Sequence, residues 1–233
     1  MVLLIVEVEM TKKIRKLLIV AFMMMLSLSI SMGEVNPLLK GQPSGWAEAD
    51  INSLAAYDQL RQEAFNSYQT EITRLDFIYL AVRLYENLNQ TDITPDTAIS
   101  FSDTNNIYAL KGATIGITSG IGNGSFGPNQ LLTREQMATM MMKVLTLSGI
   151  ELQKSASLFS DDAQISDYAK DSIYKAAKYG VINGYNGAVN PKGNATTEQV
   201  LLVYKNMYDA FSALVHQKFN STDEMNDYLI ENY

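Results

Sequence analysis

The sequence predicts a mainly α fold, in which three helix–loop–helix repeats surround a shared central three-helix bundle with pseudo-threefold symmetry. A short phrase that begins a helical pattern occurs three times, with starts 60 and 63 residues apart. Each copy is followed by apolar residues at the spacing i, i+3, i+4, i+7, which is typical of one helix face. Hydrophobic residues make up 47% of the chain, so a packed core is expected.

The repeated phrase places unusual chemistry at two helix starts. Its copies read Ile72-Thr73-Arg74-Leu75-Asp76, Leu132-Thr133-Arg134-Glu135-Gln136 and Ala195-Thr196-Thr197-Glu198-Gln199. Arg74 and Arg134 lie where the aligned backbone dipoles are already positive, so a cation there opposes the dipole. We interpret both arginines as sites for an anionic ligand. Thr197 stands at the corresponding place in the third copy, which lacks the guanidinium.

The other residues of the phrase have a structural explanation. Thr133 with Gln136 and Thr196 with Gln199 match the capping box, and Thr73 with Asp76 is a near match. The apolar faces that follow should pack together as one core, with methionine as filler rather than as a metal or cofactor site. These faces are Phe77, Leu80, Ala81 and Leu84; Met137, Met140, Met141 and Val144; and Val200, Val203, Tyr204 and Met207.

The repeats and the flanking composition predict five segments. Residues 1–33 are a signal peptide, because a basic patch from Lys12 to Lys16 precedes an apolar run over 17–30 that is short for a membrane span. An uncleaved N-terminal anchor is the alternative. The repeats cover 34–95, 96–150 and 151–212, and 213–233 form a polar tail. The first helix of the first repeat is expected at about 47–60.

Composition and motifs exclude several functions. The absence of cysteine excludes disulfides, thiol catalysis and thiolate metal sites. Beyond residue 33 the chain has 14 Lys and Arg against 23 Asp and Glu, which makes nucleic-acid binding a poor hypothesis. The single histidine, His216, has no matched nucleophile, and the adjacent Asp161 and Asp162 are a weak pair for glycoside hydrolysis. We predict a protein that is not an enzyme and needs no cofactor.

Several phrases, taken in order, resemble the S-layer homology module over roughly residues 44–211. They include Phe101-Ser102-Asp103, Phe159-Ser160-Asp161, Gly180-Val181-Ile182-Asn183-Gly184-Tyr185 and Leu132-Thr133-Arg134-Glu135. The resemblance implies three modules that fold around a central helix bundle and anchor an exported protein non-covalently to the bacterial cell wall. It implies a secondary cell-wall polysaccharide as ligand, often pyruvylated, held between lobes by the arginine of the repeated phrase.

The resemblance and the residues together suggest a set of ligand-binding candidates. These are Arg74, Arg134, Trp46, Asp103, Gly122, Gly124, Tyr168, Asp161 and Gly184. Glycine turns allow a sugar to approach the backbone, and an aromatic such as Trp46 can cover a sugar face. Structural alternatives remain: the arginines pair with carboxylates of an adjoining lobe, Trp46 is a packing anchor, and Asp103 and Asp161 cap the following helix.

We therefore expect a non-catalytic wall-binding protein in the cell wall or S-layer of a bacterium. Its expected partners are the secondary cell-wall polysaccharide and other S-layer or envelope proteins, with no nucleic acid and no membrane after signal cleavage. One alternative is an envelope interaction scaffold with degenerate glycan sites. A less favoured alternative is a cell-wall hydrolase.

Overall fold

Helices provide the regular secondary structure of residues 42–54, 68–154 and 159–216, the ranges that this computed structural model describes. They are α2 (Glu48–Leu54), α3 (Arg74–Asn89), α4 (Ile107–Thr114), α5 (Arg134–Leu147), the 3-10 helix η2 (Asp162–Gln164), α6 (Asp167–Lys178) and α7 (Thr197–His216). Extended pairing in the same ranges is limited to isolated bridges. The prediction of a mainly α fold is confirmed.

The long helices α3 and α5 begin at the predicted threonine caps. The Thr133 hydroxyl accepts a hydrogen bond from the Gln136 N–H, and the Gln136 side chain accepts one from the Thr133 N–H, which completes a capping box. Thr73 likewise accepts from the Asp76 N–H. At the start of α7, only one of the two capping-box hydrogen bonds forms: the Thr196 N–H donates to the Gln199 side chain. These caps fix where each helix starts and therefore where Arg74 and Arg134 stand.

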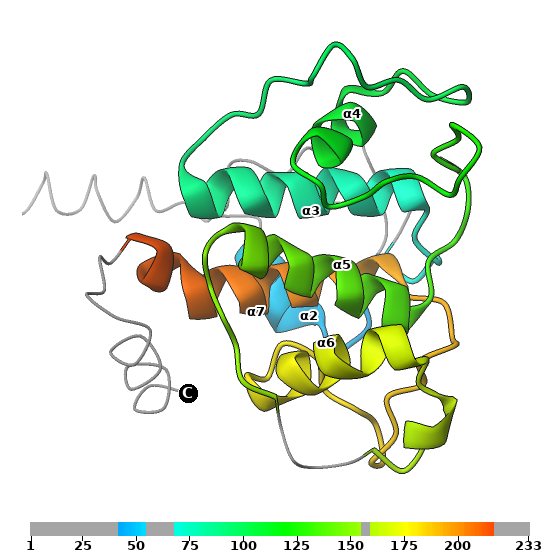
Figure 1. The fold of residues 1–233 in the computed structure, drawn as a ribbon. Coiled ribbons are helices and arrows are strands. Elements are labelled where there is room, and N and C mark those ends of the chain that lie inside the picture. Colours follow the sequence, from blue (N-terminus) through cyan, green and yellow to red (C-terminus); the bar gives the residue numbers. More distant parts are fainter. Residues whose placement is uncertain (1–41, 55–67, 155–158, 217–233) are drawn as a thin grey trace, which may run out of the picture. The chain divides into compact units, whose positions relative to one another are not determined.

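The starts of α3, α5 and α7 lie at the same end of the fold, on the right in Figure 1. Each start donates backbone hydrogen bonds to the loop that precedes the next long helix, and α7 returns to the loop before α3. The pairs are Arg74 to Gln130 (2.7 Å), Arg134 to Gly193 (2.9 Å) and Thr197 to Thr70 (2.9 Å). The helix starts are thus joined in a closed ring, and each start faces a loop of a different repeat.

The short helices follow the same cyclic rule. α4 packs on α3, α6 packs on α5, and α2 packs on α7, so the first and last helices of the described chain meet. Each short helix therefore belongs to one repeat in sequence and covers the long helix of another in space. This arrangement brings residues from two repeats together at every long-helix start.

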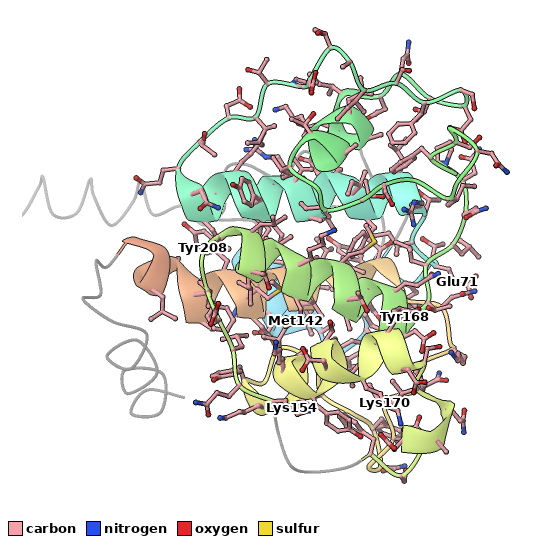
Figure 2. The ribbon with its side chains drawn as sticks, viewed as in Figure 1. Glu71, Met142, Lys154, Tyr168, Lys170 and Tyr208 are labelled. Carbon is pink, nitrogen blue, oxygen red and sulfur yellow. The ribbon has the colours of Figure 1, made fainter. Side chains whose placement is uncertain are left out.

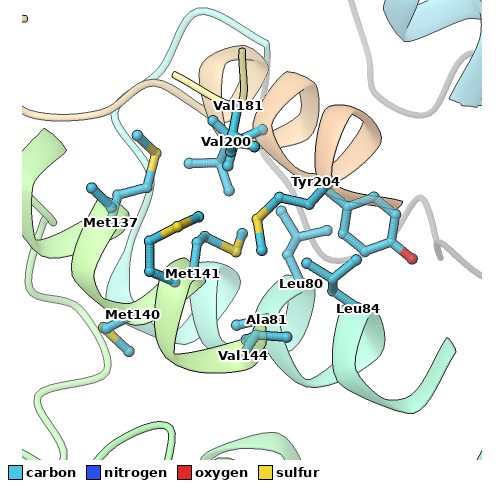
Figure 3. Close-up of a cluster of buried hydrophobic side chains, with 14 of the residues drawn as sticks. Leu80, Ala81, Leu84, Met137, Met140, Met141, Val144, Val181, Val200 and Tyr204 are labelled. Carbon is cyan, nitrogen blue, oxygen red and sulfur yellow. The ribbon is translucent and has the colours of Figure 1, made fainter. Parts of the chain in front are cut away.

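The apolar faces predicted from spacing form the core, as Figure 3 shows for side chains of α3, α5 and α7. Every residue of the three predicted stripes is 9% exposed or less. The methionines of α5 are filler within this core, where their flexible side chains can fit irregular gaps. Threefold pseudo-symmetry stays a prediction, because α3 packs against both α5 and α7 whereas α5 and α7 share no comparable interface.

A buried ion pair also ties α4 to α3. The Lys111 Nζ donates to Glu86 Oε1 at 2.7 Å and to Asp92 Oδ1 at 2.5 Å, and the Arg83 Nη1 donates to the other Glu86 oxygen at 2.9 Å. The side chains of Lys111 and Glu86 are 8% and 2% exposed. The pair also holds Asp92, and with it the loop that follows α3, against the two helices.

Some predicted segments lie partly outside the described residues. α7 continues to His216, and its apolar face extends to the buried Phe211 and Leu214. α2 runs from Glu48 to Leu54, one residue after the predicted start at about 47, and residues 55–60 of the predicted helix lie outside the described residues. The predicted signal peptide and residues 217–233 also lie outside them. Within the described ranges, no helix has the length and apolarity that a membrane span requires.

Candidate functional site

Arg74 crosses from the start of α3 to the glycine-rich turn of the second repeat. Its Nη2 donates to Thr118 Oγ1 at 2.6 Å and to the Gly120 carbonyl at 3.2 Å, and its guanidinium lies 5.3 Å from the centre of the Phe126 ring. Its Nε is buried without a partner in the described part of the chain. Burial lowers the pKa of Arg74, which still leaves an arginine charged at neutral pH.

Arg134 makes the equivalent crossing from α5 to the third repeat. Its Nε donates to the Val189 carbonyl at 2.7 Å, and its Nη1 donates to Gln199 Oε1 at 2.9 Å. Burial lowers the pKa of Arg134, and the nearby charge of Asp161 works in the opposite direction. Arg134 therefore contacts both the third-repeat turn and the first turn of α7.

The charge of both arginines is left without a paired carboxylate. Among residues 42–54, 68–154 and 159–216, neither guanidinium forms an ion pair within 4.0 Å, so the alternative of an interlobe salt bridge is wrong for the described chain. Their hydrogen-bond partners are neutral oxygens. A partly buried cation at a positive helix start is electrostatically unfavourable, and an anion bound there would relieve it.

Asp103 and Asp161 hold the glycine turns instead of capping helices. The Asp103 carboxylate accepts from the N–H groups of Phe126 and Gly127, both at 2.8 Å. Asp161 accepts in the same way from Val189 and Asn190 at 3.0 and 2.7 Å. The expected helix caps are wrong, because Asn106 caps α4 and Asp161 forms no side-chain cap to η2. Both aspartates therefore shape the turns that the arginines contact.

The candidate glycines have two different surroundings. Gly122 and Gly124 lie exposed at the tip of the second-repeat turn with φ of +98° and +70°, and no atom lies within 4 Å of a Cβ built on either. Gly184 is instead packed, because a Cβ there would lie 2.8 Å from the Ala188 carbonyl oxygen and 2.9 Å from the Phe159 ring. Gly122 and Gly124 leave open space for a ligand, whereas Gly184 allows the turn itself to close.

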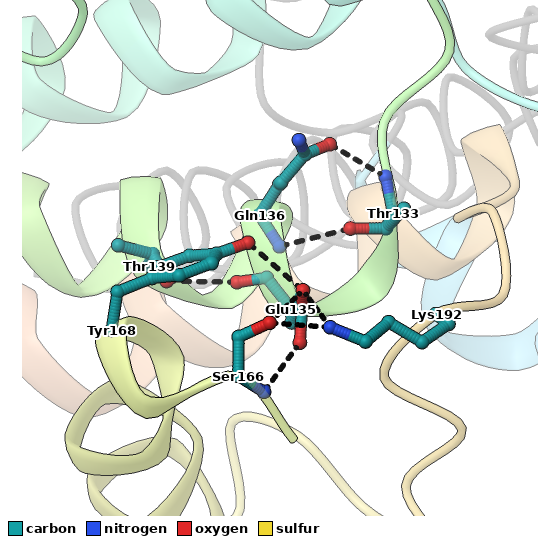
Figure 4. A network of polar contacts seen from close by, with 7 residues as sticks. All are labelled: Thr133, Glu135, Gln136, Thr139, Ser166, Tyr168 and Lys192. Atoms are coloured by element: carbon teal, nitrogen blue, oxygen red, sulfur yellow. Dashed lines mark hydrogen bonds and ion pairs between the residues drawn. The ribbon is translucent and has the colours of Figure 1, made fainter. Parts of the chain in front are cut away.

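Glu135, the residue after Arg134, is the centre of a polar network that Figure 4 shows. It accepts from the Ser166 N–H and hydroxyl at 3.0 and 2.9 Å, the Tyr168 hydroxyl at 3.0 Å and the Lys192 Nζ at 2.7 Å. Burial acts to raise the pKa of Glu135, but the hydrogen bonds from Lys192, Ser166 and Tyr168 outweigh it and lower that pKa. Burial and the Glu135 contact raise the pKa of Tyr168 to about 12.

Glu198 at the start of α7 has a smaller version of this network. It accepts from the Ser44 N–H at 2.9 Å and the Ser44 hydroxyl at 2.8 Å, and Gln69 reaches the same hydroxyl at 3.4 Å, as Lys192 reaches Ser166. Trp46 follows Ser44 as Tyr168 follows Ser166. Trp46 therefore lies with the third helix start, which lacks an arginine.

The predicted residues thus divide among three places, which we name by their helix starts. The α3 site comprises Arg74, Leu75, Asp103, Gly122 and Gly124. The α5 site comprises Arg134, Glu135, Asp161, Ser166, Tyr168, Gly184 and Lys192. The α7 site comprises Ser44, Trp46, Gln69, Thr197 and Glu198. Figure 2 shows Tyr168 at the end of the fold where the long helices start.

Sequence reasoning missed Glu135, Ser166 and Lys192 as parts of the α5 site. One signal was present, because glutamate follows the arginine position in the second and third copies while Leu75 stands there in the first. Their partners come from another repeat, so spacing within one copy could not reveal them. No cluster of three or more residues suited to a metal ion occurs in the described ranges.

A family model for the S-layer homology domain matches residues 100–138 and 158–201, which include the turns held by Asp103 and Asp161 and the starts of α5 and α7. These two segments are S-layer homology sequence. The matched domain is a non-catalytic cell-wall anchoring module, which indicates a location at the cell surface.

Proteins named as enzymes and as a surface-layer protein align with this chain. An amylopullulanase of Thermoanaerobacterium thermosulfurigenes is 32% identical over 168 residues, which cover 68% of this chain and 9% of that protein. The exoglucanase XynX of Acetivibrio thermocellus is 31% identical over 194 residues, 72% of this chain and 17% of that protein. A surface-layer 125 kDa protein of Lysinibacillus sphaericus is 28% identical over 162 residues, 65% of this chain and 13% of that protein. The alignments therefore span a small part of each relative.

Proposed function

We propose that this protein anchors itself non-covalently to the cell wall by binding an anionic, pyruvylated secondary cell-wall polysaccharide through Arg74 and Arg134. The observation that carries the proposal is the pair of guanidinium groups at helix starts, each bonded only to neutral oxygens among the described residues. The match of two segments to the S-layer homology domain supports the wall as the place of binding. The three-repeat division over 34–212 and export through the segment before residue 34 belong to the same proposal.

Each arginine keeps hydrogen-bonding capacity for a ligand. Arg134 uses Nε and Nη1, and Arg74 uses Nη2, so one terminal nitrogen of each has no partner within the described residues. A pyruvate ketal presents a carboxylate, which forms short charge-assisted hydrogen bonds with a guanidinium. The contacts already made to Thr118 and Val189 hold each group in place before binding, which reduces the entropic cost.

Because the overall charge of the chain is negative, binding of an acidic polymer must depend on local geometry. The chain carries a net charge of −7, so long-range electrostatics repel an acidic polymer from most of the surface. Two fixed arginines can still bind a repeating polymer at two points, and the linked second contact raises the apparent affinity. We therefore expect binding to the wall to weaken when either arginine is lost and to weaken more when both are lost.

Sedimentation with purified cell walls tests the proposal. Arg134→Ala should reduce binding about tenfold or more, since a charge-assisted hydrogen bond contributes about 1.5–3 kcal/mol. Walls stripped of their secondary polymer should bind neither the parent nor the variant. Lys143→Ala is the matched control, because Lys143 is an exposed cation further along α5, away from the helix start.

Two results would count against this function. Equal binding of the Arg74→Ala, Arg134→Ala double variant and the parent would remove the arginines from the mechanism. Binding that survives removal of the polymer would favour an envelope interaction scaffold. Both variants need a check by circular dichroism, because Arg134 also bonds Val189 and Gln199 and its loss lowers stability.

A further inference from the structure

The three helix-start sites differ in formal charge. The α3 site has Arg74 beside the neutral Leu75, and the α5 site has Arg134 and Lys192 against Glu135. The α7 site has Glu198 with neither cation, because threonine and glutamine occupy the positions of Arg134 and Lys192. With Asp103 and Asp161 included, the α3 and α5 sites are formally neutral and each holds a cation, whereas the α7 site carries one net negative charge.

Thr197 does not replace the missing guanidinium. Its side chain is buried, at 3% exposure for the residue, and its hydroxyl donates to the Thr70 carbonyl at 3.2 Å. Glu198 is 4% exposed and accepts from Ser44, with no lysine or arginine bonded to it in the described part of the chain. Among the described residues, an acidic sugar would meet a carboxylate here and no counter-charge.

Trp46 and the equivalent Tyr168 are similarly exposed, at 60% and 56%, whereas the equivalent Tyr108 is half-buried. The equivalent Tyr168 is tied by its hydroxyl to Glu135, and Tyr108 packs edge-on against Tyr79 with ring centres 4.7 Å apart. A large flat ring left exposed beside a polar network is a surface that can cover the apolar face of a sugar.

We propose that the α7 site binds an uncharged sugar residue over Trp46, in contrast to the acidic residue taken by the other two sites. This inference rests on the proposed function, since it assigns the third contact of the same polysaccharide. The aromatic ring supplies contact area, and the carboxylate of Glu198 excludes a ketal-bearing sugar. The protein then binds two kinds of sugar residue along one polymer: acidic ones at the α3 and α5 sites, and an uncharged one at the α7 site.

Trp46 allows a direct test, because it is the only tryptophan of the chain. Its fluorescence is titrated in the Arg74→Ala, Arg134→Ala double variant, so that the α7 site acts alone. The probes are the purified secondary wall polymer and the same polymer after mild-acid removal of its pyruvate ketals. Both should change Trp46 emission with midpoints within about twofold. Adding Thr197→Arg should then favour the native polymer about tenfold.

The outcomes separate this inference from the anchoring proposal. Emission that responds only to the ketal-bearing polymer, or to neither polymer, would overturn a neutral-sugar site at α7. If Thr197→Arg does not make the protein prefer the native polymer over the ketal-free one, charge does not decide which sugar the α7 site binds. The anchoring proposal is judged separately, by the arginine dependence of wall sedimentation, and can succeed while the α7 inference fails.

Discussion

Glu135 offers a quantitative test of how the lobes are held together. Glu135→Gln keeps the size of the side chain but removes the charge that accepts hydrogen bonds from Ser166, Tyr168 and Lys192. A charge-assisted hydrogen bond contributes about 1.5–3 kcal/mol and a neutral one about 0.5–1.5 kcal/mol. Because Lys192 and Tyr168 are largely exposed, water replaces part of the loss. We expect a decrease in the free energy of unfolding of about 2–3 kcal/mol.

The loss in the free energy of unfolding caused by Glu135→Gln should be larger at neutral pH than at acidic pH. The pKa of Glu135 is lowered in the folded state, so the stabilisation from its charge is present above the unfolded pKa, about 4.3. It is lost as the pH falls through the lower, folded pKa. The difference between Glu135→Gln and the parent should therefore be full at pH 7 and small near pH 3.

Urea unfolding at both pH values measures this difference. Glu198→Gln should cost less, about 1–1.5 kcal/mol, because among the described residues only Ser44 donates to its carboxylate. Glu151→Gln, at an exposed position after α5, is the control and should change stability little. A Glu135→Gln loss that is equal at pH 7 and pH 3 would refute the electrostatic reasoning and indicate a packing effect.

Other perturbations test the core, the ion pair and the turn. Lys111→Met should lower the free energy of unfolding by about 3 kcal/mol, because Glu86 loses a buried partner; an unchanged urea midpoint would contradict this. Phe77→Ala, at a position with 0% exposure, should cost about 3–5 kcal/mol by the same assay. Asp103→Asn should lower the melting temperature and speed proteolysis near Phe126, because the carboxylate pairs with two backbone N–H groups; unchanged cleavage would argue against that role.

Much of the fold could be predicted from local patterns. The three apolar stripes and the threonine caps are encoded within single helices, so their spacing is visible in the sequence. The buried Met137 and the complete cap at Thr133 agree with that prediction. The sequence also showed the two arginine positions, because the helix dipole disfavours a cation at a helix start and one placed there is therefore unusual.

The composition of each site could not be predicted in the same way. Arg134 reaches Val189 and Gln199, which lie 55 and 65 residues away. The segment around Trp46 meets the start of α7 because Ser44 bonds Glu198 and α2 packs on α7, although these elements lie far apart in the sequence. The resemblance to a family suggested one set of ligand contacts, whereas cyclic packing divides the set among three helix starts.

The sequence by itself determined the helices, their buried faces and the two helix-start arginines, since each depends on residues within a few turns of one another. Only the tertiary structure decided that Asp103 and Asp161 hold turns, that neither arginine has a carboxylate partner in the described chain, and that Ser44, two residues before Trp46, bonds Glu198. The physical reason is that these facts depend on side chains from different repeats, and their meeting is set by how the helices pack around the ring.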